Sequence, residues 1–215
     1  MTFSEENYLK TIYHLTAVSD ADISTNAIAE SISTKASSVT DMLKKLAEKE
    51  LVNYIKYQGV SLTDQGQLAA KMIVRKHRLW ETFLVEKLDF SWDEVHDLAE
   101  QLEHIKSEKL INKLDDFLEN PTKDPHGDPI PDAKGRIVIV DKQLLSEFPE
   151  NQIGICVGVK DSSSEFLKYL DKQKIALGSK IEIIEKETFD SSFRIRVGEI
   201  EIAISNKIAN NIYIK

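Results

Sequence analysis

Two histidines and two glutamates are spaced along one predicted helix so that their side chains share a face. At positions i, i+4, i+7 and i+8 stand His96, Glu100, Glu103 and His104. At about 100° per residue they form one stripe, and the opposite side of the helix is apolar. His77 and Glu81 repeat the i, i+4 spacing on a preceding helix. This arrangement of imidazole nitrogens and carboxylate oxygens predicts a metal site.

The types of donor atom indicate which ions would bind. Imidazole and carboxylate without any thiolate suit Mn(II) or Fe(II). The general affinity order of such sites still favours zinc and copper, so Zn(II) or other divalent ions are expected to substitute in vitro. We therefore expect Mn(II) or Fe(II) as the ion.

Other uses of the cluster explain the pattern less well. The simplest is a solvated acidic helix on which the histidines have no role. A di-iron oxidase would need Glu-x-x-His from two helices, whereas Glu100 is followed three residues later by Glu103, and no second copy exists. The sequence also lacks a phosphate loop, a nucleophile elbow and a zinc-protease motif. A metal-binding protein that is not an enzyme is predicted.

The residues before this cluster predict three helices and then a two-strand ribbon. Apolar residues recur at helical spacing from Tyr8 to Leu15, and Ser24 is a plausible N-cap for a short second helix. A third helix follows from about Ser37, and residues 51–55 and 60–63 alternate around a glycine turn. This order predicts a winged helix-turn-helix, a fold that commonly reads DNA.

The third helix carries the residue types of a recognition helix. Short polar side chains, which can contact base edges, lie at its N-terminal end. Lysines, which can contact phosphates, follow them. The predicted DNA contacts are Lys35, Ala36, Ser37, Ser38, Thr40, Lys44 and Lys45, with Lys56 at the ribbon tip. Asp41 would face phosphate unless it accepts from a cytosine amine. A winged helix used only for protein contacts is the alternative.

The remaining chain predicts an α+β protein of three domains. Residues 65–118 are helical in pattern, and four of the five prolines fall in the irregular stretch 120–131. Beyond residue 136 apolar residues alternate as in strands, interrupted by one amphipathic helix at about 163–172. We expect a winged helix-turn-helix at 1–74, a helical metal-binding domain at 75–140, and a small β-barrel or sandwich at 141–215.

Composition limits the class of protein further. The net charge of −8 argues against DNA binding only at first sight, because residues 76–120 hold twelve acidic side chains against six basic ones and hence much of the acidity. No apolar run approaches the ~18 residues that span a bilayer, and no signal peptide is evident, so a cytoplasmic protein without membrane contact is expected. The single cysteine, Cys156, lies in an apolar run and is predicted to be buried in a strand.

Taken together, these motifs resemble the diphtheria toxin repressor family, and most closely its manganese transport regulators with a C-terminal extension. The resemblance covers nearly the whole chain and rests on Glu6–Tyr13, Ser37–Thr40, Arg75–Leu79 with Glu81, Val95–His104, and Asn120–Pro131. It implies a homodimer whose second domain (75–140) both dimerises and binds metal, an SH3-like (FeoA-like) third domain (141–215), and repression of metal-uptake genes at palindromic operator DNA. A winged-helix regulator with a non-metal effector and a metal-buffering protein remain the alternatives.

The resemblance also implies which residues hold metal. His77, Glu100, Glu103 and His104 match ligands of a primary site, and Asn7 stands at its first-helix position. An ancillary site is matched by Glu81, Asp124, His126 and Asp161. In the iron branch, His96 matches an ancillary ligand and Glu165 lies near where the third domain supplies ligands. Glu100 stands where that branch has cysteine, which favours manganese.

Two residues depart from the family pattern. Asn7 replaces the usual Asp or Met with an amide oxygen, which is a weaker ligand. Lys10 stands where some manganese regulators have a glutamate that completes a second, neighbouring metal site. A lysine there argues against a two-metal cluster.

Overall fold

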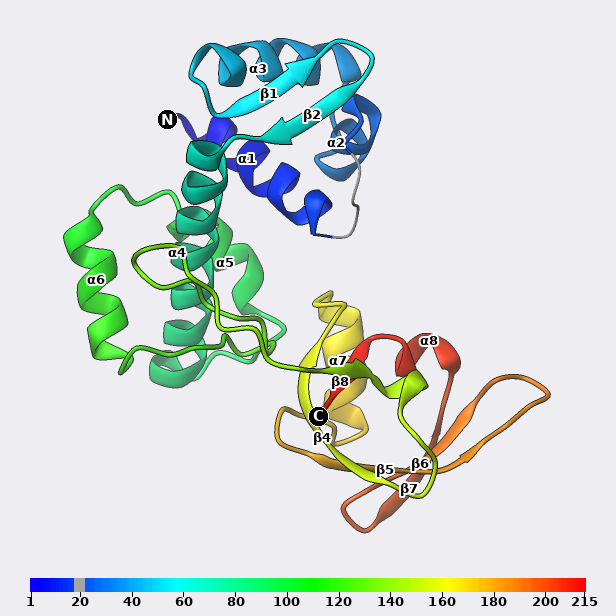
Figure 1. The fold of residues 1–215 in the computed structure, drawn as a ribbon. Coiled ribbons are helices and arrows are strands. Elements are labelled where there is room, and N and C mark those ends of the chain that lie inside the picture. Colours follow the sequence, from blue (N-terminus) through cyan, green and yellow to red (C-terminus); the bar gives the residue numbers. More distant parts are fainter. Residues whose placement is uncertain (18–21) are drawn as a thin grey trace. The chain divides into compact units, whose positions relative to one another are not determined.

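The computed structural model describes residues 1–17 and 22–215, and its N-terminal part is a winged helix-turn-helix (Figure 1). Its elements are α1 (Phe3–Thr16), α2 (Thr25–Ser31), α3 (Ala36–Glu48), β1 (Val52–Ile55) and β2 (Gly59–Leu62). The two strands pair antiparallel, with Val52 opposite Leu62 and Ile55 opposite Gly59. The predicted fold and order of elements are confirmed for this part of the chain.

Local sequence explains where these helices begin. Thr2 and Glu5 form a capping box at the start of α1, each side chain bonding the backbone of the other residue. The Ser24 hydroxyl accepts from the Ala27 amide and caps α2, as predicted. Between the elements lies a fully buried apolar core that includes Leu9, Ile12, Ile28, Leu43 and Leu46. Each such side chain contributes about 1.5–3 kcal/mol by leaving water.

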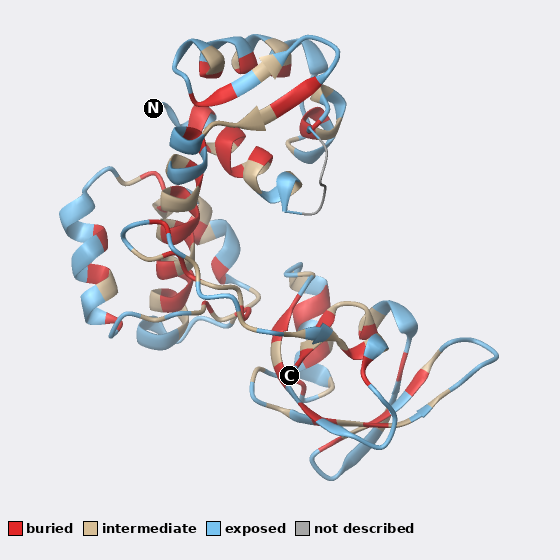
Figure 2. Cartoon of the chain, in the orientation of Figure 1, coloured by how far each residue is buried: buried red, intermediate tan, exposed pale blue. Residues whose placement is uncertain are grey.

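Three helices follow the ribbon and carry the metal-ligand candidates. They are α4 (Asp64–Leu88), α5 (Val95–Leu102) and α6 (Glu108–Phe117). The expectation of one helix through His104 was wrong, because α5 ends at Leu102 and the Ile105 amide bonds the Leu102 carbonyl in a turn. Glu103 and His104 therefore leave the helical stripe. Both are buried rather than exposed. Buried positions also run along α4 in this part of the chain (Figure 2).

The proline-rich segment is irregular, as predicted, and its own hydrogen bonds hold its shape. The Asp124 amide bonds the Asp128 carbonyl at 3.0 Å, and the Ile130 amide bonds the Thr122 carbonyl at 3.0 Å. The Asp124 carboxylate accepts from the backbone amides of His126 and Asp128, both at 2.9 Å. These bonds fix the positions of Asp124 and His126.

The C-terminal part is a six-stranded antiparallel sheet in the order β3-β8-β4-β5-β6-β7. The strands are β3 (Gln143–Leu144), β4 (Ile153–Val159), β5 (Lys180–Lys186), β6 (Phe193–Val197), β7 (Ile200–Ile204) and β8 (Ile212–Ile214). The predicted helix is α7 (Ser164–Lys172), and short helices η1 (Leu145–Glu147) and α8 (Asn206–Ala209) were not predicted. Along the edge strand β7 the expected inward alternation fades, since Ile204 is buried but Ile200 is 43% exposed.

Cys156 lies in β4 and is buried, as predicted. Burial raises the pKa of its thiol to about 11, so the thiolate nucleophile is scarce at neutral pH. Its role is therefore packing.

The chain divides into two compact units. One comprises residues 1–77, 100–113 and 131–137, and the other comprises 78–99, 114–130 and 138–215. Each unit contains one group of candidate ligands that lies entirely within it. Among the described residues, no helix combines the length and the apolar character required to cross a bilayer.

Candidate metal centre

The first unit brings three of the predicted primary-site residues together. His77 of α4, Glu100 of α5 and Glu103 each offer a ligand atom, and these atoms lie within 4.8 Å of one another. The His77 Nδ1 is 2.7 Å from Glu103 Oε2 and 4.0 Å from Glu100 Oε1. Glu103 is completely buried and Glu100 is partly exposed. We call this group the first cluster.

Lys10 of α1 ion-pairs with both carboxylates of the first cluster. Its ammonium contacts Glu100, and it lies 2.7 and 2.8 Å from the two Glu103 oxygens. Burial by itself raises the pKa of Glu103, but the hydrogen bond from His77 and the charge of Lys10 outweigh it and leave the pKa lowered. The Glu103 carboxylate is therefore held ionised inside the protein.

Two other predicted primary-site residues lie nearby but outside the first cluster. His104 turns its Nδ1 to Glu6 Oε2 at 2.7 Å, and its ring stacks on Phe3. The Asn7 side-chain oxygen is buried and has no hydrogen-bond partner among the described residues. Such an unmatched acceptor is costly unless something binds it. Carboxylates, an imidazole and this free oxygen are donors that fit a divalent cation.

Sequence reasoning did not assign a role to Glu6. The signal was available, because Glu6 and Lys10 stand four residues apart and share one face of α1. Both side chains contact a candidate ligand at or just after the end of α5. This face of α1 therefore joins the DNA-binding domain to the first cluster.

The second unit holds a second cluster, formed by Glu81 of α4 with Asp124 and His126 of the proline-rich segment. All three are buried, and their ligand atoms lie within 4.8 Å of one another. His126 Nδ1 is 3.5 Å from Glu81 Oε2, and its Nε2 donates to the Trp92 carbonyl at 2.8 Å. The carbonyl thus orients the ring so that the other nitrogen faces the carboxylates, as around metal-bound histidines.

Burial and neighbouring charges shift the pKa values of two residues in the second cluster. Burial, then the charges of Glu81 and Asp128, raise the pKa of Asp124 to about 7. Burial lowers the pKa of His126, but the hydrogen bond and charge of Glu81 raise it to about 9. Arg78 lies 3.4 Å from Asp124 and only partly offsets the crowding of carboxylates. The donor set fits a divalent ion here too.

The remaining predicted ligands lie outside the second cluster. His96 is half exposed, with its Nδ1 3.4 Å from Glu81 Oε1. Asp161 accepts from the Ser163 amide at 2.8 Å, and Glu165 is exposed on α7. Among the described residues of this unit, neither Asp161 nor Glu165 joins Asp124 and His126. Their roles as ligands stay predictions from the resemblance.

Gly127 gives a test of the segment that holds the second cluster. Its φ is +86°, and a Cβ there would lie 2.2 Å from the Val157 carbonyl oxygen. We expect Gly127→Ala to lower the free energy of unfolding by more than about 2 kcal/mol, as measured by denaturant melting. Gly178→Ala is the matched control, because Gly178 has φ +85° but nothing within 4 Å of an added Cβ. Equal losses in both variants would show that the close approach to Val157 has no cost.

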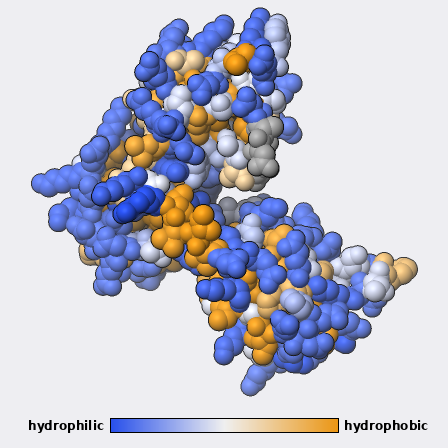
Figure 3. Space-filling view, in the orientation of Figure 1, coloured by the Kyte–Doolittle hydropathy of each residue, from blue (hydrophilic) through white to orange (hydrophobic). Residues whose placement is uncertain are grey.

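The predicted DNA-contacting residues lie along α3 and at the ribbon tip. Lys35 to Ser38 are exposed at the start of α3, Lys44 and Lys45 are exposed further along, and Lys56 lies near Tyr57 at the ribbon tip. The visible face of this domain is largely hydrophilic (Figure 3). A groove of about 330 Å³ separates the ribbon from the starts of α2 and α3, and it is lined by Ser24, Thr25, Asn26, Ala36, Thr40, Tyr54, Lys56, Tyr57, Gln58 and Gly59.

The Thr40 hydroxyl donates to the Ala36 carbonyl at 3.0 Å. Asp41 lies 3.6 Å from the Lys44 ammonium. The Asp41 carboxylate, whose charge would repel phosphate, thus has a cationic neighbour.

A winged helix-turn-helix followed by helices with two buried clusters of histidine and carboxylate defines a class: DNA-binding regulators that respond to metal ions.

Comparison with known proteins identifies the family. Residues 1–60 match the iron dependent repressor N-terminal DNA binding domain, 63–132 the iron dependent repressor metal binding and dimerisation domain, and 143–215 the FeoA domain. A solved manganese-dependent transcriptional repressor in complex with manganese shares 34% identity, covers 98% of both chains and superposes with a TM-score of 0.88. ScaR with bound Zn²⁺ shares 33% identity over 98% of both chains, with a TM-score of 0.79.

A curated relative agrees with these structures. The iron-dependent repressor IdeR of Mycobacterium tuberculosis is 34% identical over 126 residues, which are 59% of this chain and 54% of IdeR, about half its length. The chain belongs to the diphtheria toxin repressor family of metal-dependent transcriptional repressors, in the manganese branch with a C-terminal FeoA domain. These relatives are repressors, which agrees with the expectation of a protein that is not an enzyme.

Proposed function

We propose that this chain binds palindromic operator DNA as a homodimer when Mn(II) or Fe(II) is bound, and so represses metal-uptake genes in the cytoplasm. The observation that supports this most directly is the buried first cluster, His77, Glu100 and Glu103, in contact with α1 of the winged domain. A regulator needs a ligand site coupled to its DNA-binding element, and this contact supplies the coupling.

The chain's own residues suggest how binding would be transmitted. A divalent ion would supply positive charge between α1 and the carboxylates at the end of α5. Asn7 offers its unmatched oxygen from α1, while His77 fixes the Glu103 carboxylate from α4. When Asn7 and the other ligands hold α1 in one position, the two DNA-binding domains of the dimer can adopt fewer arrangements. A hundredfold preference of the ion for the DNA-competent arrangement shifts the population by about 2.7 kcal/mol.

The donor atoms favour manganese or iron as the physiological ion. Both clusters contain only imidazole nitrogens, carboxylate oxygens and, in the first, the nearby amide oxygen of Asn7. Glutamate at position 100 in place of a thiolate favours the harder Mn(II). A relative bound to manganese is consistent with this choice, and ScaR with zinc agrees with substitution in vitro.

The test is operator binding by chelator-treated protein. A labelled palindromic promoter fragment is titrated with protein in the presence of Mn(II), Fe(II), Zn(II) or chelator. We expect tight binding only with metal, and Mn(II) or Fe(II) to be effective at the lowest free concentration. Binding of equal strength in chelator would exclude the metal switch, and metal uptake without operator binding under any ion would favour a metal-buffering protein.

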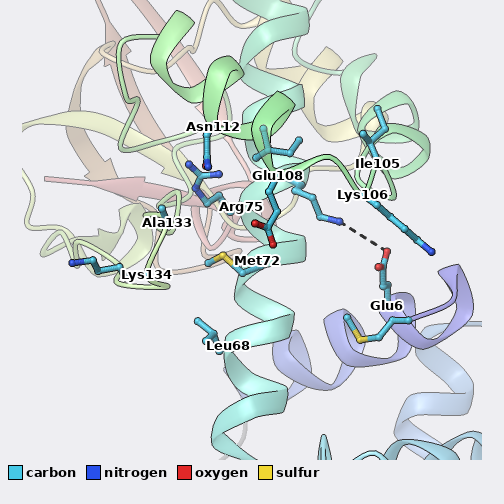
Figure 4. Close-up of a pocket in the computed structure, with 13 residues that line it drawn as sticks. Glu6, Leu68, Met72, Arg75, Ile105, Lys106, Glu108, Asn112, Ala133 and Lys134 are labelled. Atoms are coloured by element: carbon cyan, nitrogen blue, oxygen red, sulfur yellow. Dashed lines mark ion pairs between the residues drawn. The ribbon is translucent and has the colours of Figure 1, made fainter.

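A regulator with a non-metal effector is the second candidate, and one cavity favours it. In the first unit a cavity of about 490 Å³ is lined by polar and apolar side chains, among them Arg75, Met72 and Asn112 (Figure 4). The ion pair between Lys76 and Glu6 borders it. Thermal melting separates the two candidates, because metal stabilises the chain at micromolar concentration only if the clusters bind it.

Lys56 provides a test of the DNA-binding surface. Its ammonium lies 4.8 Å from the centre of the Tyr57 ring at the exposed ribbon tip. We expect Lys56→Ala to weaken binding to all DNA sequences alike and to reduce the salt slope of the operator affinity by about 1. Lys160→Ala, an exposed lysine of the C-terminal domain, is the control. If the salt dependence of operator affinity is unchanged in Lys56→Ala, the ribbon tip does not contact DNA.

A further inference from the structure

The carboxylates of the first cluster already hold a cation, and that cation is part of the chain. The Lys10 ammonium contacts Glu100 and lies 2.7 and 2.8 Å from both oxygens of Glu103. The Lys10 side chain is mostly buried, and the Glu103 side chain is fully buried. The contact is therefore a desolvated ion pair that water does not weaken, unlike a pair on the surface.

An ammonium and a divalent ion cannot both use these oxygens. The ammonium engages both Glu103 oxygens, and two cations a few ångströms apart in a buried site repel each other strongly. A divalent ion reaches Glu100 and Glu103 only if the Lys10 ammonium withdraws from them. The free energy of the lysine ion pairs is then subtracted from the free energy of metal binding.

The neighbouring side chains match this exchange. Asn7 lies three residues before Lys10, so both occupy one face of α1. Lys10 connects α1 to the carboxylates, while the Asn7 oxygen is buried without a partner among the described residues. The same face of α1 thus carries Lys10, which is bonded to the carboxylates, and the Asn7 oxygen, which is available to bind a cation.

We propose that Lys10 is an internal cation that competes with the divalent ion for Glu100 and Glu103. It sets the metal affinity of the first cluster and so the metal concentration at which repression begins. This inference rests on the proposed function, in which the first cluster is the regulatory metal site. Lys10 acts by holding the ligand atoms of Glu100 and Glu103.

The test measures Mn(II) affinity in chelator-treated full-length protein. His126→Gln is used as the background, so that the second cluster does not obscure the titration. Calorimetric titration then compares Lys10→Met, which removes the charge but keeps the length, with the background protein. Lys76→Met is the matched control: Lys76 is also mostly buried and lies 4.0 Å from Glu6, but its nearest acidic partner is not in the first cluster.

We expect Lys10→Met to bind Mn(II) about ten- to a hundredfold more tightly, a change of about 1.4–2.7 kcal/mol. Lys76→Met should change the affinity by less than about threefold, because it alters only the long-range electrostatic potential at the first cluster. Lys10→Met should also melt at a lower temperature without metal and gain more from Mn(II), since its buried carboxylates have lost their partner. If Lys10→Met does not fold, Lys10→Gln keeps a hydrogen-bond donor without the charge.

The outcomes separate this inference from the proposed function. Unchanged or weaker Mn(II) binding by Lys10→Met and Lys10→Gln overturns the competition. An equal gain in Lys76→Met also overturns it, because the effect would then be the charge of the whole region. If the background protein binds no Mn(II) and operator binding by the native chain ignores Mn(II), the proposed function fails instead.

Discussion

Replacing Glu103 by alanine is expected to abolish metal-dependent operator binding. Glu103 is the fully buried member of the first cluster, and its two oxygens contact both His77 and Lys10. Removal of an outer residue that merely orients a metal ligand costs about 10- to 100-fold in affinity, so loss of a ligand should cost at least a hundredfold. The population of the DNA-competent form falls with the metal affinity.

The same substitution has a second effect in the absence of metal. The Lys10 ammonium keeps only Glu100 as a partner and remains mostly buried. We expect the free energy of unfolding of the metal-free protein to fall by about 1–3 kcal/mol, while the fold is retained. Glu103→Gln preserves the shape and should lose metal response with a smaller loss of stability.

The measurements are a Mn(II) titration of operator binding and a denaturant melt in chelator. Glu108→Ala is the control, because Glu108 is an exposed acid at the start of α6. It should leave both curves within experimental error. If Glu103→Ala kept full metal dependence, Glu103 would not be a ligand of the regulatory site, and the second cluster would be the better candidate.

The fold followed from the sequence because each element has its own local pattern. Helical spacing of Leu9 and Ile12 predicted α1, and Ser24 marked the start of α2 through a hydrogen bond that the structure contains. The alternation of Phe193, Ile195 and Val197 predicted a half-buried strand, and all three are buried in β6. The short helices η1 and α8 lacked such patterns, because three or four residues are too few to show a period.

The first cluster was predictable only in part. Spacing of one helical turn grouped Glu100 with its neighbours, but the 100° rule ends where the helix ends at Leu102. Beyond that point the chain direction decides where a side chain goes, and His104 turns to Glu6 on α1. That contact joins residues 98 positions apart, which no local pattern encodes. The ion pairs of Lys10 with Glu100 and Glu103 could not be predicted from the sequence for the same reason.

The second cluster shows a related limit. The resemblance groups Asp124 and His126 with Asp161. In the structure Asp161 accepts a hydrogen bond from the Ser163 amide, and its role as a ligand stays a prediction. The position of Asp124 and His126 depends on hydrogen bonds inside an irregular segment and on the close approach of Gly127 to β4. Such contacts arise from tertiary packing, and neither periodicity nor composition reports them.

The second cluster also predicts how the stability of the metal-free protein depends on pH. The folded pKa of Asp124, about 7, exceeds the usual value near 4, chiefly because the carboxyl is buried. Its stabilising contribution is complete below about pH 4 and is lost as the pH rises through 7. The folded pKa of His126, about 9, exceeds the usual 6.5 because Glu81 lies beside it. Its contribution is lost between about pH 6.5 and 9.

The metal-free chain should therefore become less stable as the pH rises from 5 to 9. Because the two groups interact, their contributions do not simply add, and we expect a loss of about 3 kcal/mol, or roughly 10 °C in melting temperature. Glu5 and Glu103 have lowered pKa values, so their contributions are lost only below about pH 4.5 and leave this window unaffected.

The experiment is thermal melting in chelator between pH 5 and 9, for the native chain, Asp124→Asn and the control Asp161→Asn. Asp124→Asn should flatten the curve below pH 7 and keep the fall above it, whereas Asp161→Asn should follow the native curve. A native curve that rises with pH would show that neither group is strained. With Mn(II) present the slope should reverse, because bound metal favours the deprotonated carboxylate and imidazole. The distance between the two curves at each pH then reports how much the bound ion stabilises the protein.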